Sequence, residues 1–515
     1  MIPVLNAKGM RAADQETIRG GVDSETLMEN AARALCEEIR GSHPGWKRVT
    51  VVCGPGNNGG DGLAAARLLA ARGVTTSVFT LRDPASYSGD AATNAERARA
   101  AGLTIETLAA RGGLARLRSA LAGSDAALDA LFGTGLSRAL TGDARRAVEA
   151  VNAAGRPVIA ADVPSGLSAD DGEVRGPTVR AARTVALAAP KLCHVLPPGS
   201  GFCGRLVVAD IGISRDALRR RARRLWMSEP SDLAAWLPPR PLDSHKADFG
   251  RLAILAGSRG KTGAAVLAAR GALRAGAGLV TVFCASTLEP IVVGALPEAM
   301  TAGLPEEDGA VSGEAAGSLV RRLRDFDALV MGPGLGTSDG TVRCIEAALA
   351  LDLPLLADAD ALNAFRGRPS RFARRRAPTV LTPHPGEAGR LLGRSAREVQ
   401  ADRLGAARSL ARRSGSVVLL KGARSLIAEP SGEVVVNPTG SPLLATAGSG
   451  DVLSGVIGAL LAGGLEPRDA AIAGAYLHGA AAESLAVRLG DAGLLAREAA
   501  DAVPGVRRRL TGVDT

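Results

Sequence analysis

A glycine-rich turn with a single carboxylate, at residues 447–451, has the clearest chemical meaning in this chain. Glycine has no Cβ, so the N–H groups around Gly448 and Gly450 can approach a phosphate closely. The apolar helix expected to follow adds about half a positive charge at its N-terminus. Asp451 could take a proton from a hydroxyl that faces a bound phosphoanhydride. The alternative is that Asp451 only caps the helix, and an isolated match leaves that alternative open.

Other suggestive loops of the second half each follow an expected strand. The segment 257–261 is too short for the Gly-x-x-x-x-Gly-Lys-[ST] phosphate loop, which argues against a P-loop ATPase. His384 is held between two prolines, and with no other histidine nearby we do not expect a metal site there. Lys421 follows a strand, where its side chain and the adjoining backbone could meet a phosphate.

In the first half, polar residues follow three expected strands. The first loop, residues 57–62, reads Asn-Asn-Gly-Gly-Asp-Gly, the second starts at Asp129, and the third starts at Asp162. Ligands of open parallel sheets bind beyond the carboxyl ends of the strands. The two carboxylates could bind a cation or move protons, although each loop alone could consist of caps and turns. Three such loops at one sheet edge predict a ligand site.

Both halves alternate short apolar strands with helices, so the sequence predicts an α/β fold in two domains. A chain of 515 residues is too long for one core. The Arg-rich and then Pro-rich segment 215–241 is the expected linker. Strands are expected at 49–53, 77–81, 126–131, 157–161, 184–188 and 206–210, and then at 252–256, 279–283, 328–331, 353–357, 379–382 and 417–420.

Composition narrows the expected partners and compartment. The formal charge is +10, but aromatic residues make up only 3%, and no nucleic-acid-binding module is recognisable, so we expect no nucleic-acid partner. No apolar run approaches the roughly 20 residues that span a bilayer, and no signal peptide is evident, so we expect no membrane partner. The six scattered cysteines predict reduced, packed thiols in the cytoplasm.

Residues 11–35, with the loops at 57–62, 129–137 and 162–166, resemble the NAD(P)H-hydrate epimerase domain over most of residues 1–220. The resemblance implies a Rossmann-like fold that interconverts the R and S epimers at C6 of hydrated NADH or NADPH (NADHX and NADPHX). It implies a potassium ion held by Asn58, Asp129 and Ser165. Independently of the resemblance, Asp162 ends a strand beside the turn at 164–166, which makes it the best-placed acid–base candidate of the first half. The implied contacts of the hydrated nucleotide are Asn57, Asn58, Gly59, Gly60, Asp61, Gly133, Thr134, Gly135, Leu136, Ser137, Arg138, Ala139 and Asp162. Asp171 departs from the family pattern, where we expect Thr, and receives no role.

Residues 228–508 resemble the ribokinase-like, ADP- or ATP-dependent NAD(P)H-hydrate dehydratase. Pro-His-Pro-Gly-Glu at 383–387, Lys-Gly-Ala at 421–423 and Ala-Gly-Ser-Gly-Asp at 447–451 carry the resemblance in that order. The implied contacts of the hydrated nucleotide are Ala264, Gly334, His384 and Asp451, and those of the adenosine nucleotide are Lys421, Gly422, Ala423, Arg424, Ser425 and Gly450. Ala247 departs from the family pattern, where we expect Gly.

Together the resemblances predict a bifunctional NAD(P)H-hydrate repair enzyme. We expect a Rossmann-like three-layer epimerase domain at 1–225 and a ribokinase-like dehydratase domain at 228–510. Asp451 would deprotonate the C6 hydroxyl as it attacks the terminal phosphate of ADP, and loss of phosphate would give NAD(P)H, AMP and phosphate. The expected partners are NADHX, NADPHX and ADP with magnesium, and the chain is expected to form a homo-oligomer. ADP is favoured over ATP because the composition resembles that of a bacterial protein.

Two other functions remain open at this point. A vitamin or sugar kinase would share the glycine turn, but it would leave a stable phosphorylated substrate where a dehydratase leaves free phosphate. The first half could instead be a nucleotide-binding regulatory module without catalysis. The joint presence of Asn58, Asp129 and Asp162 argues against that module, and epimer exchange by the isolated half would decide.

Overall fold

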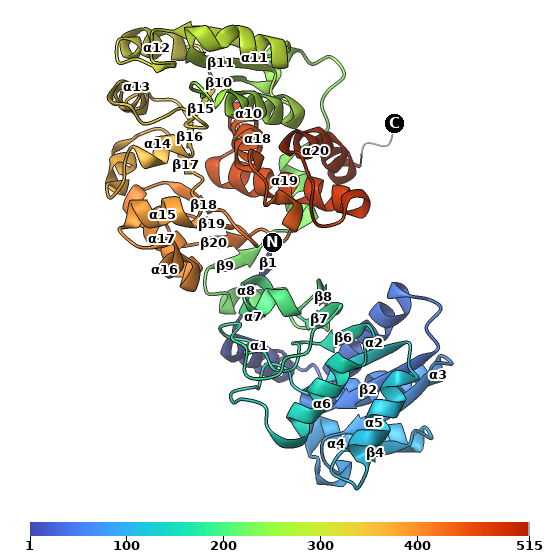
Figure 1. Ribbon diagram of the computed structural model, residues 1–515. Coiled ribbons are helices and arrows are strands. Elements are labelled where there is room, and N and C mark those ends of the chain that lie inside the picture. The colour runs from blue at the N-terminus through green and yellow to red at the C-terminus, as the bar shows by residue number, and fades with distance from the viewer. Residues whose placement is uncertain (513–515) are drawn as a thin grey trace. The chain divides into compact units, whose positions relative to one another are not determined.

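The structure, a computed structural model, describes residues 1–512 and divides into two compact α/β units. The N-terminal unit is Ile2–Leu225, and the C-terminal unit begins at Trp226 and also includes Met1. The two-unit α/β architecture is therefore the one expected from the alternation of strands and helices (Figure 1). None of the helices described is both long enough and apolar enough to cross a membrane.

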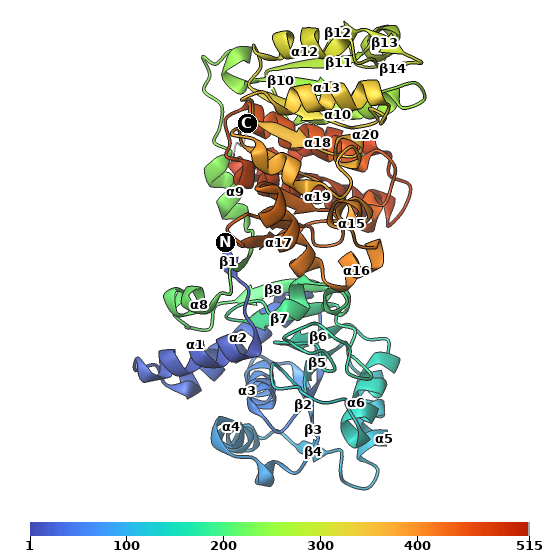
Figure 2. The same ribbon diagram turned by 90° about the vertical axis from the view of Figure 1, so that its left-hand side faces the viewer.

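The N-terminal unit has one sheet of seven parallel strands in the order β4-β3-β2-β5-β6-β7-β8. Helices α3 and α4 lie on one side of the strands, and α5 and α6 lie on the other (Figure 2). The strand order reverses between β2 and β5, and this switch point is where doubly wound sheets bind ligands. The elements are β1 (Ile2–Pro3), α1 (Ala7–Arg19), α2 (Ser24–Ser42), β2 (Arg48–Cys53), α3 (Asn57–Ala71), β3 (Thr75–Thr80), α4 (Gly89–Ala100), β4 (Ile105–Thr107), α5 (Gly113–Ala122), β5 (Ala126–Ala130), α6 (Gly142–Ala153), β6 (Val158–Ala161), β7 (Arg183–Leu187), α7 (Leu192–Val195), β8 (Arg205–Ala209) and α8 (Arg215–Arg221).

The C-terminal unit has a sheet that runs in the order β9-β20-β19-β18-β17-β16-β15-β10-β11-β12. In this order, neighbouring strands from β18 through β17, β16, β15, β10 and β11 to β12 pair in parallel. Strand β19 pairs antiparallel with both β18 and β20. Helices α12 to α17 cover one face, and α10, α18, α19 and α20 cover the other (Figure 1). The elements are β9 (Leu225–Met227), α9 (Pro230–Trp236), β10 (Arg251–Leu255), α10 (Thr262–Ala275), β11 (Leu279–Ala285), α11 (Glu289–Ala295), β12 (Met300–Leu304), β13 (Glu306–Glu307), β14 (Ala310–Val311), α12 (Ala315–Leu323), β15 (Ala328–Met331), α13 (Asp339–Leu349), β16 (Leu355–Ala357), α14 (Asp360–Asn363), β17 (Thr379–Leu381), α15 (Pro385–Leu392), α16 (Ala396–Ala401), α17 (Arg403–Ser414), β18 (Val417–Leu420), β19 (Leu426–Ala428), β20 (Val434–Val436), α18 (Ser449–Ala462), α19 (Pro467–Leu489) and α20 (Ala496–Thr511).

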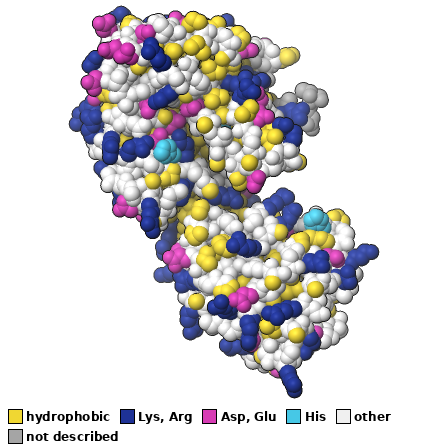
Figure 3. Space-filling model, in the orientation of Figure 1, with side chains coloured by type: hydrophobic (Ala, Val, Ile, Leu, Met, Phe, Trp, Pro, Cys, Tyr) yellow, Lys and Arg dark blue, Asp and Glu magenta, His cyan; other side chains and the backbone are white. Residues whose placement is uncertain are grey.

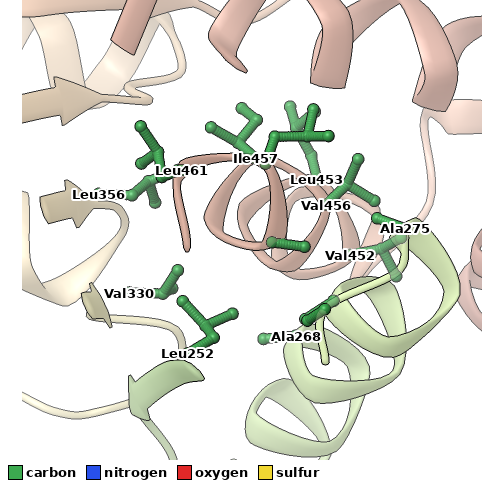
Figure 4. Packing of buried hydrophobic residues seen from close by; sticks show 14 of the residues in the cluster. Leu252, Ala268, Ala275, Val330, Leu356, Val452, Leu453, Val456, Ile457 and Leu461 are labelled. Carbon is green, nitrogen blue, oxygen red and sulfur yellow. The ribbon is translucent and has the colours of Figure 1, made fainter. Parts of the chain in front are cut away.

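Helix α18 lies in the core of the C-terminal unit and is apolar around nearly its whole circumference, as expected for a helix with no solvent-facing side. Val456, Ile457 and Leu461 pack against the sheet and against neighbouring helices (Figure 4). A Cβ at Gly455 would lie 1.8 Å from the carbonyl oxygen of Ala268, so only glycine allows α10 and α18 to approach so closely. This packing fixes the N-terminus of α18, which carries the glycine turn.

The segment expected to be a linker is folded. Residues 215–241 contain α8, β9 and α9, and the boundary between the units falls between Leu225 and Trp226. Strand β9 joins the sheet of the C-terminal unit, and Leu233 of α9 is fully buried in its core. The linker prediction was wrong because a few apolar side chains in this Arg- and Pro-rich segment are enough to anchor it to the core.

Candidate functional site

The N-terminal unit has a cavity of about 530 Å³ at the switch point of its sheet. The loops after β2, β5 and β6 line it together with α1 and α2. It therefore brings together the three polar loops singled out in the sequence. From the predicted set, the lining includes Asn57, Asn58, Asp61, Gly133, Thr134, Gly135, Leu136 and Asp162, whereas Gly59, Gly60, Ser137, Arg138 and Ala139 lie outside it.

The glycine loop after β2 is the first turn of α3, which begins at Asn57. A Cβ at Gly59 would lie 1.8 Å from the carbonyl oxygen of Gly54, and one at Gly62 would lie 2.5 Å from Cβ of Ala130. These two glycines therefore allow the helix to pack closely on the strands. The N-terminus of this 15-residue helix opens at the cavity, where its partial positive charge favours an anion.

Asp162 and Lys191 form an ion pair at the cavity. Lys191 Nζ donates to Asp162 Oδ1 at 2.5 Å and to the carbonyl oxygen of Leu187 at 2.9 Å, and the lysine side chain is only 1% exposed. Asp162 has φ +62°, a left-handed backbone conformation that costs a non-glycine residue about 1–3 kcal/mol; residues in this conformation cluster at functional sites. Burial lowers the pKa of the neighbouring His194 to about 3, so this histidine is neutral.

Three further carboxyl groups, those of Asp14, Asp61 and Asp90, line the same cavity. Burial and the charge of Asp162 raise the pKa of Asp14 to about 6, although Lys191 acts in the opposite direction. Burial, together with Asp162 and Asp14, raises the pKa of Asp61 well above its ordinary value. The cavity therefore contains carboxyl groups that can donate a proton near neutral pH. Asp14 was not among the predicted site residues, because a single aspartate on an amphipathic helix gives no signal in a sequence.

The three residues implied as potassium ligands lie on adjoining segments. Asp129 is fully buried; its Oδ1 accepts from Ser165 Oγ at 2.7 Å and from Leu131 N at 3.2 Å, and its Oδ2 accepts from Ser165 N at 2.8 Å. The Ser165 hydroxyl also accepts from Phe132 N, and the next residue, Gly133, lies against Asn58. Both polar atoms of the Asn58 side chain are buried without a hydrogen-bond partner among the described residues. An unpaired buried amide is costly, so these atoms are suited to a ligand.

The C-terminal unit has a cavity of about 430 Å³ at the carboxyl edge of its sheet. On the face seen in Figure 3, a histidine side chain lies beside acidic and basic side chains. Gly448 has φ +86°, which glycine adopts without strain, and it starts α18 with Asp451 in the first turn. The residues that line the cavity are Asp358, Ala359, His384, Pro385, Lys421, Gly422, Thr446, Gly448, Ser449, Gly450 and Asp451.

Asp358 organises this cavity. Its Oδ1 accepts from Lys421 Nζ at 2.7 Å and its Oδ2 accepts from Ser454 Oγ at 2.8 Å, so both oxygens are engaged. Burial disfavours the charged form of Lys421, but Asp358 and Glu387 outweigh that effect, and the pKa of Lys421 is raised. Asp358 was missed in the sequence because an aspartate after a strand reads as an ordinary turn residue.

Asp451 differs from Asp358 in having no hydrogen-bond partner for its side chain among the described residues. Burial and the nearby charge of Asp358 raise the pKa of Asp451 to about 7, although Lys421 acts in the opposite direction. A carboxylate with a pKa near neutrality can accept a proton efficiently at physiological pH. The geometry therefore makes Asp451 a general-base candidate.

His384 is the N-cap of α15. Its Nδ1 accepts from the backbone N–H of Gly386 at 2.9 Å, and Glu387 accepts from the backbone N–H of His384 at 2.8 Å. Burial and the charges of Lys421 and Arg390 lower the pKa of His384, so the imidazole is neutral and can donate from its other nitrogen.

Several predicted residues lie outside the lining of this cavity. Ala264 and Gly334 contact each other, because a Cβ at Gly334 would lie 2.9 Å from Cβ of Ala264. The hydroxyl of Ser425 donates to the carbonyl oxygen of Gly422 at 3.1 Å, and the guanidinium of Arg424 donates to the carbonyl oxygen of Pro438. Ala423 also lies outside the lining.

The chain matches two protein-family models. One, described as NAD(P)H-hydrate dehydratase, covers residues 252–505, and the other, described as YjeF-related protein N-terminus, covers residues 24–193. The bifunctional NAD(P)H-hydrate repair enzyme of Moorella thermoacetica is 43% identical over 500 residues, which are 95% of this chain and 93% of that protein. The Escherichia coli protein of the same name is 36% identical over 478 residues, which are 93% of this chain and 88% of that protein. A crystal structure of ADP/ATP-dependent NAD(P)H-hydrate dehydratase from Bacillus subtilis, co-crystallised with ATP and Mg²⁺, is 34% identical, with a TM-score of 0.49, and covers 56% of this chain and 100% of that one.

Proposed function

This chain belongs to the family of bifunctional NAD(P)H-hydrate repair enzymes, and we propose a location and a set of catalytic residues for each of its activities. It epimerises hydrated NADH and NADPH at C6 and dehydrates the S epimer in an ADP-dependent reaction. We assign epimerisation to residues 1–225 and dehydration to residues 228–510. A separate cavity with its own titratable groups in each unit supports this assignment.

In the dehydratase, Asp451 acts as the general base. It accepts the proton of the C6 hydroxyl as that oxygen attacks the terminal phosphate of ADP, and AMP leaves. The C6–O bond then breaks, inorganic phosphate departs, and loss of the ring proton restores the dihydropyridine. The observation that carries this proposal is the unpaired Asp451 carboxyl, with a pKa of about 7, at the start of a helix whose glycine turn lines the same cavity.

Lys421 and the N–H groups of residues 448–450 would stabilise negative charge on the transferring phosphate. The position of Lys421 supports this role, because its Nζ donates to Asp358 Oδ1 at 2.7 Å and the residue lines the same cavity as the glycine turn. The described residues contain no cluster of three or more His, Cys, Asp or Glu side chains arranged for a metal. Magnesium would therefore be held mainly by the phosphates of ADP, as is usual for nucleotide-bound Mg²⁺, and would neutralise their charge.

In the epimerase, Asp162 is the acid–base residue. Exchange at C6 requires the hydroxyl to leave as water, which takes up a proton, and water to add to the opposite face, which gives up a proton. The nitrogen lone pair of the ring stabilises the cationic intermediate, and the composition of the substrate is unchanged. The strained backbone of Asp162 and its pairing with the buried Lys191 support a functional role for this carboxyl.

The residues present fit a potassium ion. The amide oxygen of Asn58 is free to accept a cation, and Asp129 accepts three hydrogen bonds, which leaves lone-pair capacity on its carboxylate. We propose Asn58, Asp129 and Ser165 as the ligands. When bound, potassium would supply positive charge beside the cavity, where it favours the phosphates of the substrate.

We also place the enzyme in the cytoplasm and propose that it self-associates. The six cysteines are buried and free, as expected of a protein kept in a reducing compartment. Ile291, Val293 and Met300 are exposed on the adjoining α11 and β12, and such apolar side chains favour contact with a second copy. Sedimentation of the full chain tests self-association.

The test of both activities is incubation of mixed NADHX epimers with ADP and magnesium while the absorbance of NADH is followed. The full chain is expected to consume both epimers. Residues 228–515 alone are expected to consume the S epimer quickly and the R epimer only at its spontaneous exchange rate. Rapid consumption of both epimers by that fragment would contradict the role given to the N-terminal unit, and accumulation of a stable phosphorylated substrate would contradict dehydration.

A further inference from the structure

A second cavity of the N-terminal unit, of about 590 Å³, adjoins the substrate cavity. The two share one wall, to which Pro55, Phe132, Gly135 and Leu136 contribute. The two cavities are therefore direct neighbours, as the sites for the two ends of one long ligand would be. The second cavity is lined by the segments that follow β3 and β4 and by the loop that leads into α6.

Two arginines, Arg82 and Arg138, line this second cavity. Arg82 and Arg138 are exposed, and neither guanidinium forms a hydrogen bond or ion pair with any residue the structure describes. The acidic groups nearby are otherwise engaged. Asp143, which also lines the cavity, forms an ion pair with Arg146 at 2.5 Å. Asp83 does not line the cavity, and its side chain accepts a hydrogen bond from the backbone N–H of Ala85 at 3.0 Å. The cavity therefore carries an uncompensated positive charge.

The position of Arg82 in the sheet indicates which part of a dinucleotide it could contact. Arg82 comes two residues after the end of β3, which is the strand next to β2 on the far side of the switch point. In doubly wound sheets that bind dinucleotides, the residue at this position contacts the adenosine ribose, and an arginine there accommodates a 2′-phosphate. The catalytic candidate Asp162 follows β6 on the other side of the switch point, where the nicotinamide end is expected.

We propose that the second cavity receives the adenosine end of the hydrated nucleotide and that Arg82 and Arg138 bind the 2′-phosphate of NADPHX, so that the epimerase favours NADPHX over NADHX. The inference rests on the proposed epimerase activity of this unit and adds its substrate preference. Arginine suits the task, because its planar guanidinium forms paired hydrogen bonds with a phosphate.

The experiment measures epimerisation of the R epimers of NADPHX and NADHX by the full chain without ADP, with the products separated by chromatography and spontaneous exchange subtracted. The wild-type kcat/KM for NADPHX is expected to exceed that for NADHX by about ten-fold or more, the size typical of charged hydrogen bonds at the low end of their range. Arg82→Ala and Arg138→Ala are each expected to reduce this ratio, and the double variant to bring it near one. The ratio is independent of the fraction of folded enzyme, because both substrates meet the same preparation.

Arg145→Ala is the matched control. Arg145 is an exposed arginine on α6 that pairs with Glu149 and does not line the cavity, so its removal is expected to leave the ratio unchanged. As a second readout, adenosine 2′,5′-bisphosphate is expected to inhibit epimerisation more strongly than 5′-AMP, and the double variant should lose the difference. Equal kcat/KM values for the two hydrates, or a preference that survives in the double variant, would overturn the inference while leaving the epimerase activity in place. If neither hydrate is epimerised above the spontaneous rate, the epimerase assignment itself fails and the inference with it.

Discussion

Replacing Asp451 by Asn is expected to abolish dehydration and, at the same time, to stabilise the C-terminal unit. The folded protein holds the pKa of this carboxyl at about 7 against an ordinary value of 3.8, because of burial and the neighbouring Asp358. Ionisation of Asp451 is therefore easier in the unfolded chain, and stability falls as pH rises from 3.8 to about 7. Above pH 7 the full cost is present, and below 3.8 it is absent. Asn removes a charge that the folded site disfavours.

The size of the gain follows from the shift. A change of roughly three pKa units corresponds to about 4 kcal/mol at pH 8. Because the carboxyl keeps some contact with water, we expect about half of this, ~2 kcal/mol. For a unit of this size that is an increase of roughly 4–8 °C in Tm. At pH 5 the gain should be about one third as large, because only part of the interval from 3.8 to 7 has been crossed.

The assay is thermal unfolding of the full chain at pH 5 and pH 8, read from the transition that ADP raises, since ADP binds the folded C-terminal unit. Dehydration of S-NADHX is measured on the same preparations and should fall at least about 100-fold. Asp339→Asn is the control. Asp339 is exposed in the first turn of α13, where a carboxylate favours the helix, so the same substitution should cost about 0.3–1 kcal/mol there. Unchanged turnover in Asp451→Asn would refute the general-base role, and a Tm gain absent at pH 8 or equal at both pH values would refute the electrostatic reasoning.

Three further substitutions separate the remaining roles. Asp162→Asn should reduce R-to-S exchange by about 100-fold or more while leaving dehydration of the S epimer unchanged, because an amide keeps the hydrogen bonds but cannot carry a proton; exchange at the wild-type rate would make this residue structural. Asp358→Asn should move the acid limb of the dehydration pH profile down by about one pH unit, because it removes a charge that raises the pKa of the general base, whereas Ser454→Ala should leave the limb in place. Asn58→Ala should raise the potassium concentration needed for half-maximal epimerisation, and an unchanged potassium dependence would remove this side chain from the ligand set.

The sequence predicts the interior of the fold well and its edges poorly. The predicted central strands lie within two residues of the observed ones, because a strand buried on both faces is a continuous apolar run with a clear start and end. The short strands β4, β12, β19 and β20 were not predicted, since an edge or antiparallel strand of three to five residues lacks that signal. The folding of residues 215–241 was missed for the same reason, because Leu233 is buried by tertiary contacts and not by a local pattern.

The sequence predicts which loops form the two sites, but it does not predict the aspartate–lysine pairs within them. A strand-end rule finds residues such as Asp162 and Lys421 because it concerns where the chain turns. It cannot tell which carboxylate will be paired with a lysine, since Asp162 and Lys191 are 29 residues apart and Asp358 and Lys421 are 63 residues apart. That pairing is a tertiary contact, and it decides the chemistry.

Each cavity contains a lysine that pairs with one aspartate, and in each at least one other aspartate has no lysine partner. Among these unpaired groups, burial raises the pKa of Asp14 to about 6 and that of Asp451 to about 7. Environments that differ in this way can give two carboxyl groups of one site different roles in a reaction. In the C-terminal cavity Asp358 is engaged by a lysine and a serine, and we expect the unpaired Asp451 to meet the substrate. In the N-terminal cavity Asp14 and Asp162 both line the wall, and two such groups would suit the proposed epimerisation, which must give a proton on one face of the ring and take one on the other.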